Sequence, residues 1–238
     1  MILSLLSGGD IRSIVINLLL QLPVILIALS AHEASHAYAA YKMGDRTAFN
    51  LGRMTLNPIK HFDLMGFLWM MVCGYGWANP VPINARNFKN PKKGMALTAL
   101  AGPLANFILG LIGSVLFAVC SFVFVTNIQL FSENQLLFNV MGMLQTFLLY
   151  FGYLNFSLMF FNLIPVPPFD GSRIFSAFLP THWYFAIMKY EKYILIGVLV
   201  VSIICSRFFG FTPASIAAEW LVNVIANPIY SLLFRIFL

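Results

Sequence analysis

Long, predominantly apolar runs constrain this chain more than any other feature of its sequence. They cover residues 11–43, 95–125 and 136–164, and each exceeds the roughly 20 residues that an α-helix needs to cross a bilayer. Only 9% of the 238 residues are charged, whereas soluble domains carry about 25%. So few charges cannot cover a water-facing surface. We therefore expect an all-α polytopic membrane protein, because helices satisfy their own backbone hydrogen bonds in lipid.

Three other apolar segments are harder to assign. Residues 193–205 form a shorter fourth span, and residues 213–238 are apolar but are interrupted by Glu219 and Asn227-Pro228. That tail fits a fifth span, a broken helix or an interfacial helix. Residues 62–82 are rich in glycine and proline, which disfavour a continuous helix. The sequence thus predicts about 4–5 transmembrane helices plus a re-entrant or hairpin element at about 62–82.

The basic residues test this layout. If residues 62–78 return to the side they entered, 11 of the 14 Lys and Arg residues share one side: Lys42, Arg46, Arg53, Lys60, Arg86, Lys89, Lys92, Lys93, Arg173, Lys189 and Lys192. A full crossing would largely remove this asymmetry. The positive-inside rule therefore favours the re-entrant arrangement with cytoplasmic basic loops, as in a prokaryotic cell membrane. The net charge of +6 comes mostly from basic residues between the apolar runs, where they indicate membrane topology, and nucleic acid is not an expected partner.

The first run contains His32-Glu33-Ala34-Ser35-His36, an H-E-x-x-H motif. In a helix, His32 and His36 project from one face one turn apart, so their imidazoles can hold one zinc ion. Glu33 is angled to reach a zinc-bound water and take its proton. An exposed helix face could carry such a motif by chance in a soluble protein. Inside a membrane span, a carboxylate and two imidazoles are expensive and indicate function.

A zinc enzyme needs a third protein ligand, and several residues have the right chemistry. The candidates are His61, Asp63, Glu133, Asp170, His182 and Glu219. Asp170 stands out because prolines break the chain just before it and free the backbone to aim its carboxylate inward. The competing interpretation is an ordinary Asp-Gly loop turn. The residues alone leave these two possibilities open.

Taken together, three motifs resemble the site-2 protease family of intramembrane metalloproteases. They are the H-E-x-x-H motif, the segment Ala101-Gly102-Pro103-Leu104-Ala105-Asn106, and Asn162…Pro165…Asp170-Gly171, in the family's order. The chain is most similar to the short branch without a PDZ domain, and it lacks the extra span that longer members have before the first motif. The resemblance implies one membrane-embedded metalloprotease domain over 1–238, with a catalytic core at about 11–175 and C-terminal helices at about 189–238.

The resemblance also implies roles for individual residues. His32, His36 and Asp170 would bind one Zn²⁺ per chain, and Glu33 would be the catalytic base. Asn162 would hold the substrate backbone and Asn106 would act near the scissile carbonyl. A buried amide could equally tie helices together. The expected partners are the lipid bilayer and a transmembrane protein or peptide substrate, processed as a regulator or as a signal-peptide remnant. A homo-oligomer is compatible with this reading.

Two other functions fit parts of the pattern. Intramembrane His and Asp residues also line the pathways of metal-ion transporters. Transporters more often show repeat symmetry, which this sequence lacks, and they have no need of Glu33 between the histidines. A catalytically inactive membrane scaffold is the second alternative, although every expected catalytic residue type is present. For residues 62–82 we expect an edge around Gly74-Tyr75-Gly76 that holds an extended substrate segment.

Overall fold

The structure is a computed structural model that describes residues 10–73, 76–178, 180 and 189–237. Within these ranges it contains helices and irregular segments but no β-strand. In chain order the elements are α1 (Ile11–Lys42), α2 (Thr47–Asn50), α3 (Pro58–His61), α4 (Leu64–Cys73), η2 (Ala85–Asn87), α5 (Pro91–Thr126), α6 (Ile128–Glu133), α7 (Gln135–Asn162), α8 (Asp170–Ser176), α10 (Glu191–Ile204), the π-helical turn η3 (Cys205–Phe209) and α11 (Pro213–Phe237).

Four helices among the described residues are long and apolar enough to cross a membrane: Val15–Lys42, Pro91–Thr126, Gln135–Asn162 and Pro213–Ile236. This confirms the polytopic all-α class. The C-terminal tail is one helix of 25 residues, and Pro228 lies inside it without ending it. The expected span at 193–205 corresponds to α10, whose 14 residues are too short to cross by themselves.

The central helix α5 has the inverse of a soluble helix's burial pattern. It buries Thr98, Asn106 and Ser114, while Leu104 and Ile108 are about half exposed, at 51% and 49%. A soluble protein would not display such an apolar outer surface. Lipid is the solvent in which this arrangement is stable, because apolar side chains can face the lipid while the polar groups stay inside the bundle.

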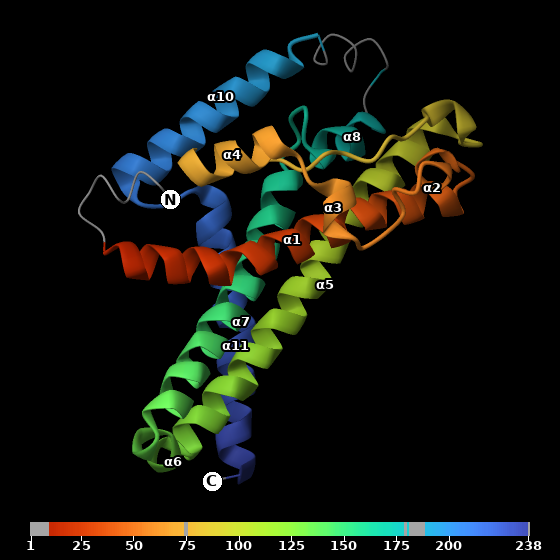
Figure 1. The fold of residues 1–238 in the computed structure, drawn as a ribbon. Helices are drawn as coiled ribbons and strands as arrows, with labels where there is room; N and C mark the ends of the chain where they lie inside the picture. Colours follow the sequence, from red (N-terminus) through yellow and green to blue (C-terminus); the bar gives the residue numbers. More distant parts are fainter. Residues whose placement is uncertain (1–9, 74–75, 179, 181–188, 238) are drawn as a thin grey trace.

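Figure 1 shows α5, α7 and α11 as one elongated bundle, with α1 crossing its upper half. Small residues allow α5 and α7 to approach closely: a Cβ added to Gly113 would lie 2.7 Å from the Gly152 backbone nitrogen. Phe156 of α7 is fully buried and packs with Met159, Ala218 and Val222 to join α7 to α11. Close backbone contact through small residues is the usual way that membrane helices associate.

The segment predicted as re-entrant consists of a short helix and an irregular return. The chain runs along α4 and comes back through residues 76–84, here called the return segment. A Cβ on Gly66 of α4 would overlap the carbonyl group of Trp77, so the two limbs are in direct contact. Of the expected substrate-binding edge, Gly74 and Tyr75 lie outside the described residues.

Candidate metal centre and active site

The two histidines lie where α1 crosses α5. Thr98, Gly102 and Asn106 occupy successive turns of α5 and face His32 and His36 on successive turns of α1. A Cβ added to Gly102 would lie 2.5 Å from the His36 ring and 2.6 Å from the His32 ring. Glycine is therefore required at this position, since both imidazoles lie directly against the α5 backbone.

Hydrogen bonds to α5 determine which nitrogen of each ring is free. Nδ1 of His36 lies 2.7 Å from the Thr98 carbonyl oxygen, which can only accept a hydrogen bond. Nδ1 of His32 lies 2.6 Å from Oδ1 of Asn106. Both rings therefore carry their proton on Nδ1 and a lone pair on Nε2. The two Nε2 atoms face each other at 3.0 Å, with the rings nearly perpendicular at 89°.

Asp170 completes this group from a distant part of the chain. It begins α8, and its Oδ2 atom lies 3.1 Å from Nε2 of His32 and 3.2 Å from Nε2 of His36. The neighbouring Gly171 packs on the end of α7, where a Cβ would overlap the Leu163 carbonyl oxygen. Glycine after the aspartate is thus needed to bring the carboxylate against the histidines.

This donor set fits a divalent cation. Oδ2 of Asp170 is buried and has no hydrogen-bond partner among the described residues. Three electron-rich atoms at 3.0–3.2 Å from one another would repel if nothing lay between them. Tetrahedral zinc with bonds of about 2.0–2.1 Å places its ligand atoms about 3.3 Å apart, close to the distances found here.

Glu33 lies beside this centre and contacts the return segment. Its Oε2 atom accepts a hydrogen bond of 2.8 Å from the Val81 backbone nitrogen. Two residues earlier, the Asn79 nitrogen donates to the His61 carbonyl oxygen at 2.8 Å, and Arg53 donates to the Asn79 carbonyl oxygen at 2.7 Å. These bonds hold the return segment next to the carboxylate.

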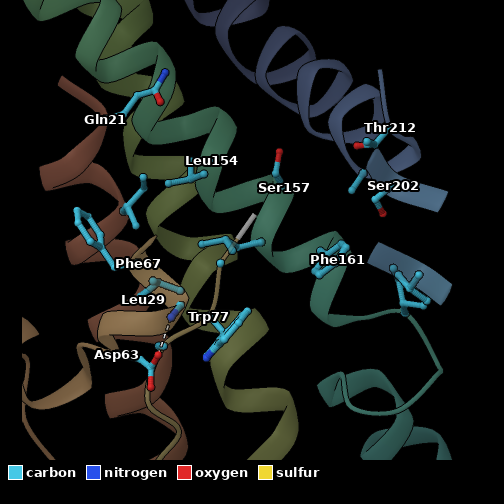
Figure 2. Close-up of a pocket in the computed structure, with 18 of the residues that line it drawn as sticks. Gln21, Leu29, Asp63, Phe67, Trp77, Leu154, Ser157, Phe161, Ser202 and Thr212 are labelled. Carbon is cyan, nitrogen blue, oxygen red and sulfur yellow. Dashed lines mark hydrogen bonds between the residues drawn. The ribbon is translucent and has the colours of Figure 1, made fainter. Parts of the chain in front are cut away.

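A cavity of about 690 Å³ lies next to α1, on turns that precede Glu33. Figure 2 shows side chains from α1, α4, α7 and the C-terminal helices converging on it, together with Trp77 of the return segment. The lining is mainly apolar and includes Leu29, Phe67, Leu154 and Phe161. The space is large enough for several apolar side chains, and its lining reaches Leu29 and Ser30, about one helical turn before Glu33.

The remaining third-ligand candidates lie elsewhere or serve other purposes. His61 is buried and its Nε2 donates to the Thr55 carbonyl oxygen at 2.8 Å, while Asp63 accepts from the Gly66 nitrogen at the start of α4. Glu133 and Glu219 are exposed, and His182 lies outside the described residues. Within the part of the chain that the structure describes, His32, His36 and Asp170 form the one group arranged to hold a metal.

The two asparagines expected to contact substrate differ in their surroundings. Asn162 is half-buried at the end of α7, and its Nδ2 donates to the Leu158 carbonyl oxygen at 3.0 Å. Asn106 is fully buried, with Oδ1 facing His32 and Nδ2 donating to Ala28 and Asn155. The amide of Asn106 is thus hydrogen-bonded within the protein, and its expected action near the scissile carbonyl stays a prediction.

Sequence reasoning missed three residues that build the centre: Thr98, Asn155 and the steric role of Gly102. Thr98, Gly102 and Asn106 are spaced by four, the spacing of one helical face, so this stripe was visible in the sequence. Asn155 had no such signal, since it meets Asn106 only when α7 packs on α5.

Comparison with known proteins agrees with this geometry. The sequence model of peptidase family M50 matches residues 21–205 of this chain. The chain is 38% identical over 179 residues to "Putative zinc metalloprotease YwhC" of Bacillus subtilis, covering 75% of this chain and 78% of that protein. It is 24% identical over 202 residues to "Putative zinc metalloprotease Rip2" of Mycolicibacterium smegmatis, covering 77% of this chain and 67% of that protein.

The Rip2 protein of Mycobacterium tuberculosis is 23% identical over 194 residues, with 78% of this chain and 68% of that protein covered. No solved structure matches the chain. The family match covers well over half of the chain and includes both histidines, Glu33 and Asp170. The protein therefore belongs to peptidase family M50, the site-2 protease family.

Proposed function

We propose that this intramembrane zinc metalloprotease uses His32, His36 and Asp170 as its zinc ligands and Glu33 as its acid–base group. The observation that carries the proposal is the convergence of two Nε2 lone pairs and one carboxylate oxygen at 3.0–3.2 Å. They converge inside an apolar bundle, where such groups are too costly to serve only for packing. Three protein ligands with one open position are typical of a catalytic zinc site.

Glu33 is placed for proton transfer. A zinc ion in the site supplies a Lewis acid that polarises the scissile carbonyl and lowers the pKa of the attacking water. Val81 occupies Oε2 of Glu33, and among the described contacts Oε1 is left to take the proton from that water. The protonated carboxyl then donates to the leaving amine, so one side chain acts first as base and then as acid.

The substrate that fits this setting is a transmembrane segment. The carbonyls of a helical segment are occupied by its own hydrogen bonds, so it must unwind before attack. The apolar cavity of about 690 Å³ offers room for the side chains of an unwound apolar segment. Asn162 supports the backbone of that segment in this proposal, because among the described contacts only its Nδ2 group has a partner.

We place the active-site end of the bundle on the cytoplasmic side of a prokaryotic cell membrane. The support is the charge distribution, because 11 of the 14 basic residues fall on that side when residues 62–82 fold back. In this proposal the catalytic core at about 11–175 and the C-terminal helices at about 189–238 form one domain. The packing of α11 on both α5 and α7 supports that assignment.

The alternatives have less support. A metal-ion transporter would not need a carboxylate next to the histidines, and the relatives are named as metalloproteases. An inactive scaffold would have no reason to keep both ring tautomers and Asp170 arranged for a metal.

Cleavage of reconstituted single-span peptides tests the proposed function. Wild type should cleave a subset of a peptide panel, and Glu33→Gln should abolish cleavage while leaving one zinc ion bound per chain, because glutamine cannot accept the proton. Zinc content measured on the same preparations is the control. Cleavage that persists in Glu33→Gln would remove Glu33 from the mechanism. Zinc transport into vesicles by both proteins would favour the transporter.

A further inference from the structure

A second buried asparagine lies behind the metal centre. It belongs to α7, which carries none of the three candidate metal ligands. Asn155 of α7 is fully buried, and its Oδ1 accepts a hydrogen bond of 2.9 Å from Nδ2 of Asn106. Its own Nδ2 donates to the Phe151 carbonyl oxygen at 2.8 Å. A continuous chain of hydrogen bonds thus runs from His32 through both asparagines to the backbone of α7.

We propose that Asn155 is a positioning residue that holds the Asn106 amide in the one orientation that leaves Nε2 of His32 free for the metal. This inference rests on the proposed zinc site. The Phe151 carbonyl can only accept, so Nδ2 of Asn155 must face it and Oδ1 must face Asn106. Nδ2 of Asn106 then faces Asn155, and its Oδ1 must face His32. The direction of the whole chain is set at Phe151.

Without Asn155 the orientation of Asn106 is weakly determined. The Ala28 carbonyl would remain as the single acceptor for its Nδ2 group, at the longer distance of 3.2 Å. If the amide turned over, it would donate to Nδ1 of His32, and the ring proton would move to Nε2. A protonated Nε2 cannot bind a metal, so the amide orientation controls a ligand.

The two histidines differ in this respect. His36 donates to the Thr98 backbone carbonyl, which cannot change its role as an acceptor. His32 relies on a side-chain amide that has two possible orientations. This difference explains why a second buried asparagine is useful on α7, and why no counterpart is needed for His36.

The test measures zinc affinity of the purified full-length protein by competition with a chelator, without reference to proteolysis. Asn155→Leu, which is similar in size, should weaken zinc binding by roughly 10- to 100-fold, the usual effect of losing an outer support of a metal ligand. The matched control is Ser114→Ala, which also removes a buried polar group between α5 and α7. Among the described residues, Ser114 Oγ donates to the Gly110 carbonyl of its own helix and has no link to the metal centre, so zinc affinity should not change.

Two further variants separate positioning from general packing. Asn155→Asp keeps a side-chain oxygen as the acceptor for Nδ2 of Asn106, and its zinc affinity should lie closer to wild type than that of Asn155→Leu. In an Asn106→Ala background, Asn155→Leu should cause no further loss, because the two residues act through one path.

Three results would overturn the inference. Asn155→Leu could bind zinc as tightly as wild type, Asn155→Asp could lose as much affinity as Asn155→Leu, or the losses could add in the double variant. A wild type that binds zinc and cleaves peptides alongside such results would show that only the role of Asn155 fails. A wild type that binds no zinc would refute the proposed function as well.

Discussion

Two stretches of α1 have different kinds of neighbour. The turns that carry His32 and His36 lie so close to α5 that Gly102 cannot accept even a methyl group. The preceding turns, which include Leu29, border a cavity of about 690 Å³ that reaches to α10. Glu33 follows His32 by one residue and contacts the return segment. One stretch of the helix thus holds the candidate metal ligands in a tight contact, and the other borders a space large enough for substrate side chains.

The largest expected effect comes from adding a side chain to the close contact between α1 and α5. Gly102→Ala should lower zinc affinity by roughly 10- to 100-fold, because the new methyl group would overlap the rings of His32 and His36 and displace both of them. The matched control is Gly197→Ala on α10, where an added Cβ meets nothing within 4 Å. Chelator competition on both proteins measures the difference. Equal affinities in the two variants would mean that the α1–α5 contact is not rigid.

Filling part of the cavity should give a smaller effect, on peptide cleavage and not on zinc binding. Val198 of α10 lines the cavity, and Val198→Trp would occupy part of it. We expect peptide cleavage to fall several-fold, mainly through a higher KM, since about one large side chain of apolar binding surface is lost. Zinc content should stay at the wild-type level. Val200 lies on the exposed side of the same helix, so the Val200→Trp protein should cleave peptides at the wild-type rate. An equal loss of cleavage in Val200→Trp would show that the cavity does not bind the substrate.

The smallest effect concerns the loop end of α1, outside the membrane span. Asp45 is covered completely and accepts hydrogen bonds from Thr47, Asn84 and Asn87. Burial alone would raise the pKa of the Asp45 carboxyl, but these hydrogen bonds hold its pKa below the usual value. Asp45→Asn should lower stability by roughly 1–3 kcal/mol at neutral pH, with little change in zinc content, because the amide keeps one acceptor oxygen and turns an NH2 group toward a donor that the second carboxylate oxygen had accepted from.

The sign of the pH dependence follows from that lowered pKa. Stabilisation by Asp45 is complete above about pH 4, the range of an unfolded aspartate, and is lost as pH falls through the lower folded value. The difference in melting temperature between wild type and Asp45→Asn should therefore narrow below about pH 4. A difference that widens on acidification would contradict the hydrogen-bonded carboxylate.

Local patterns in the sequence were enough for the helices and for half of the metal centre. The apolar runs predict the long spans, and the i, i+4 spacing places His32 and His36 on one face of a helix. These features depend on neighbours within one or two turns. The tail at 213–238 was ambiguous because a proline usually ends or kinks a helix, yet Pro228 lies inside a continuous α11.

Contacts between distant segments were not predictable in the same way. Asp170 meets the histidines only because Gly171 lets α8 pack against the end of α7, and the residues alone left a simple loop turn equally open. The hydrogen bond between Asn106 and Asn155 joins two different helices, so the sequence carried no signal for it. The spacing of residues along one helix does not reveal which helix it will touch, so supports of the metal ligands emerge only with the packed structure.

Zinc content per chain, measured on purified protein, tests the central claim most directly. Wild type should carry one zinc ion, Asp170→Ala should lose it, and Glu219→Ala, which removes an exposed carboxylate that was also a ligand candidate, should retain it. The loss follows from removing one of three donor atoms that converge at 3.0–3.2 Å. Full zinc occupancy in Asp170→Ala would contradict the assignment of this centre.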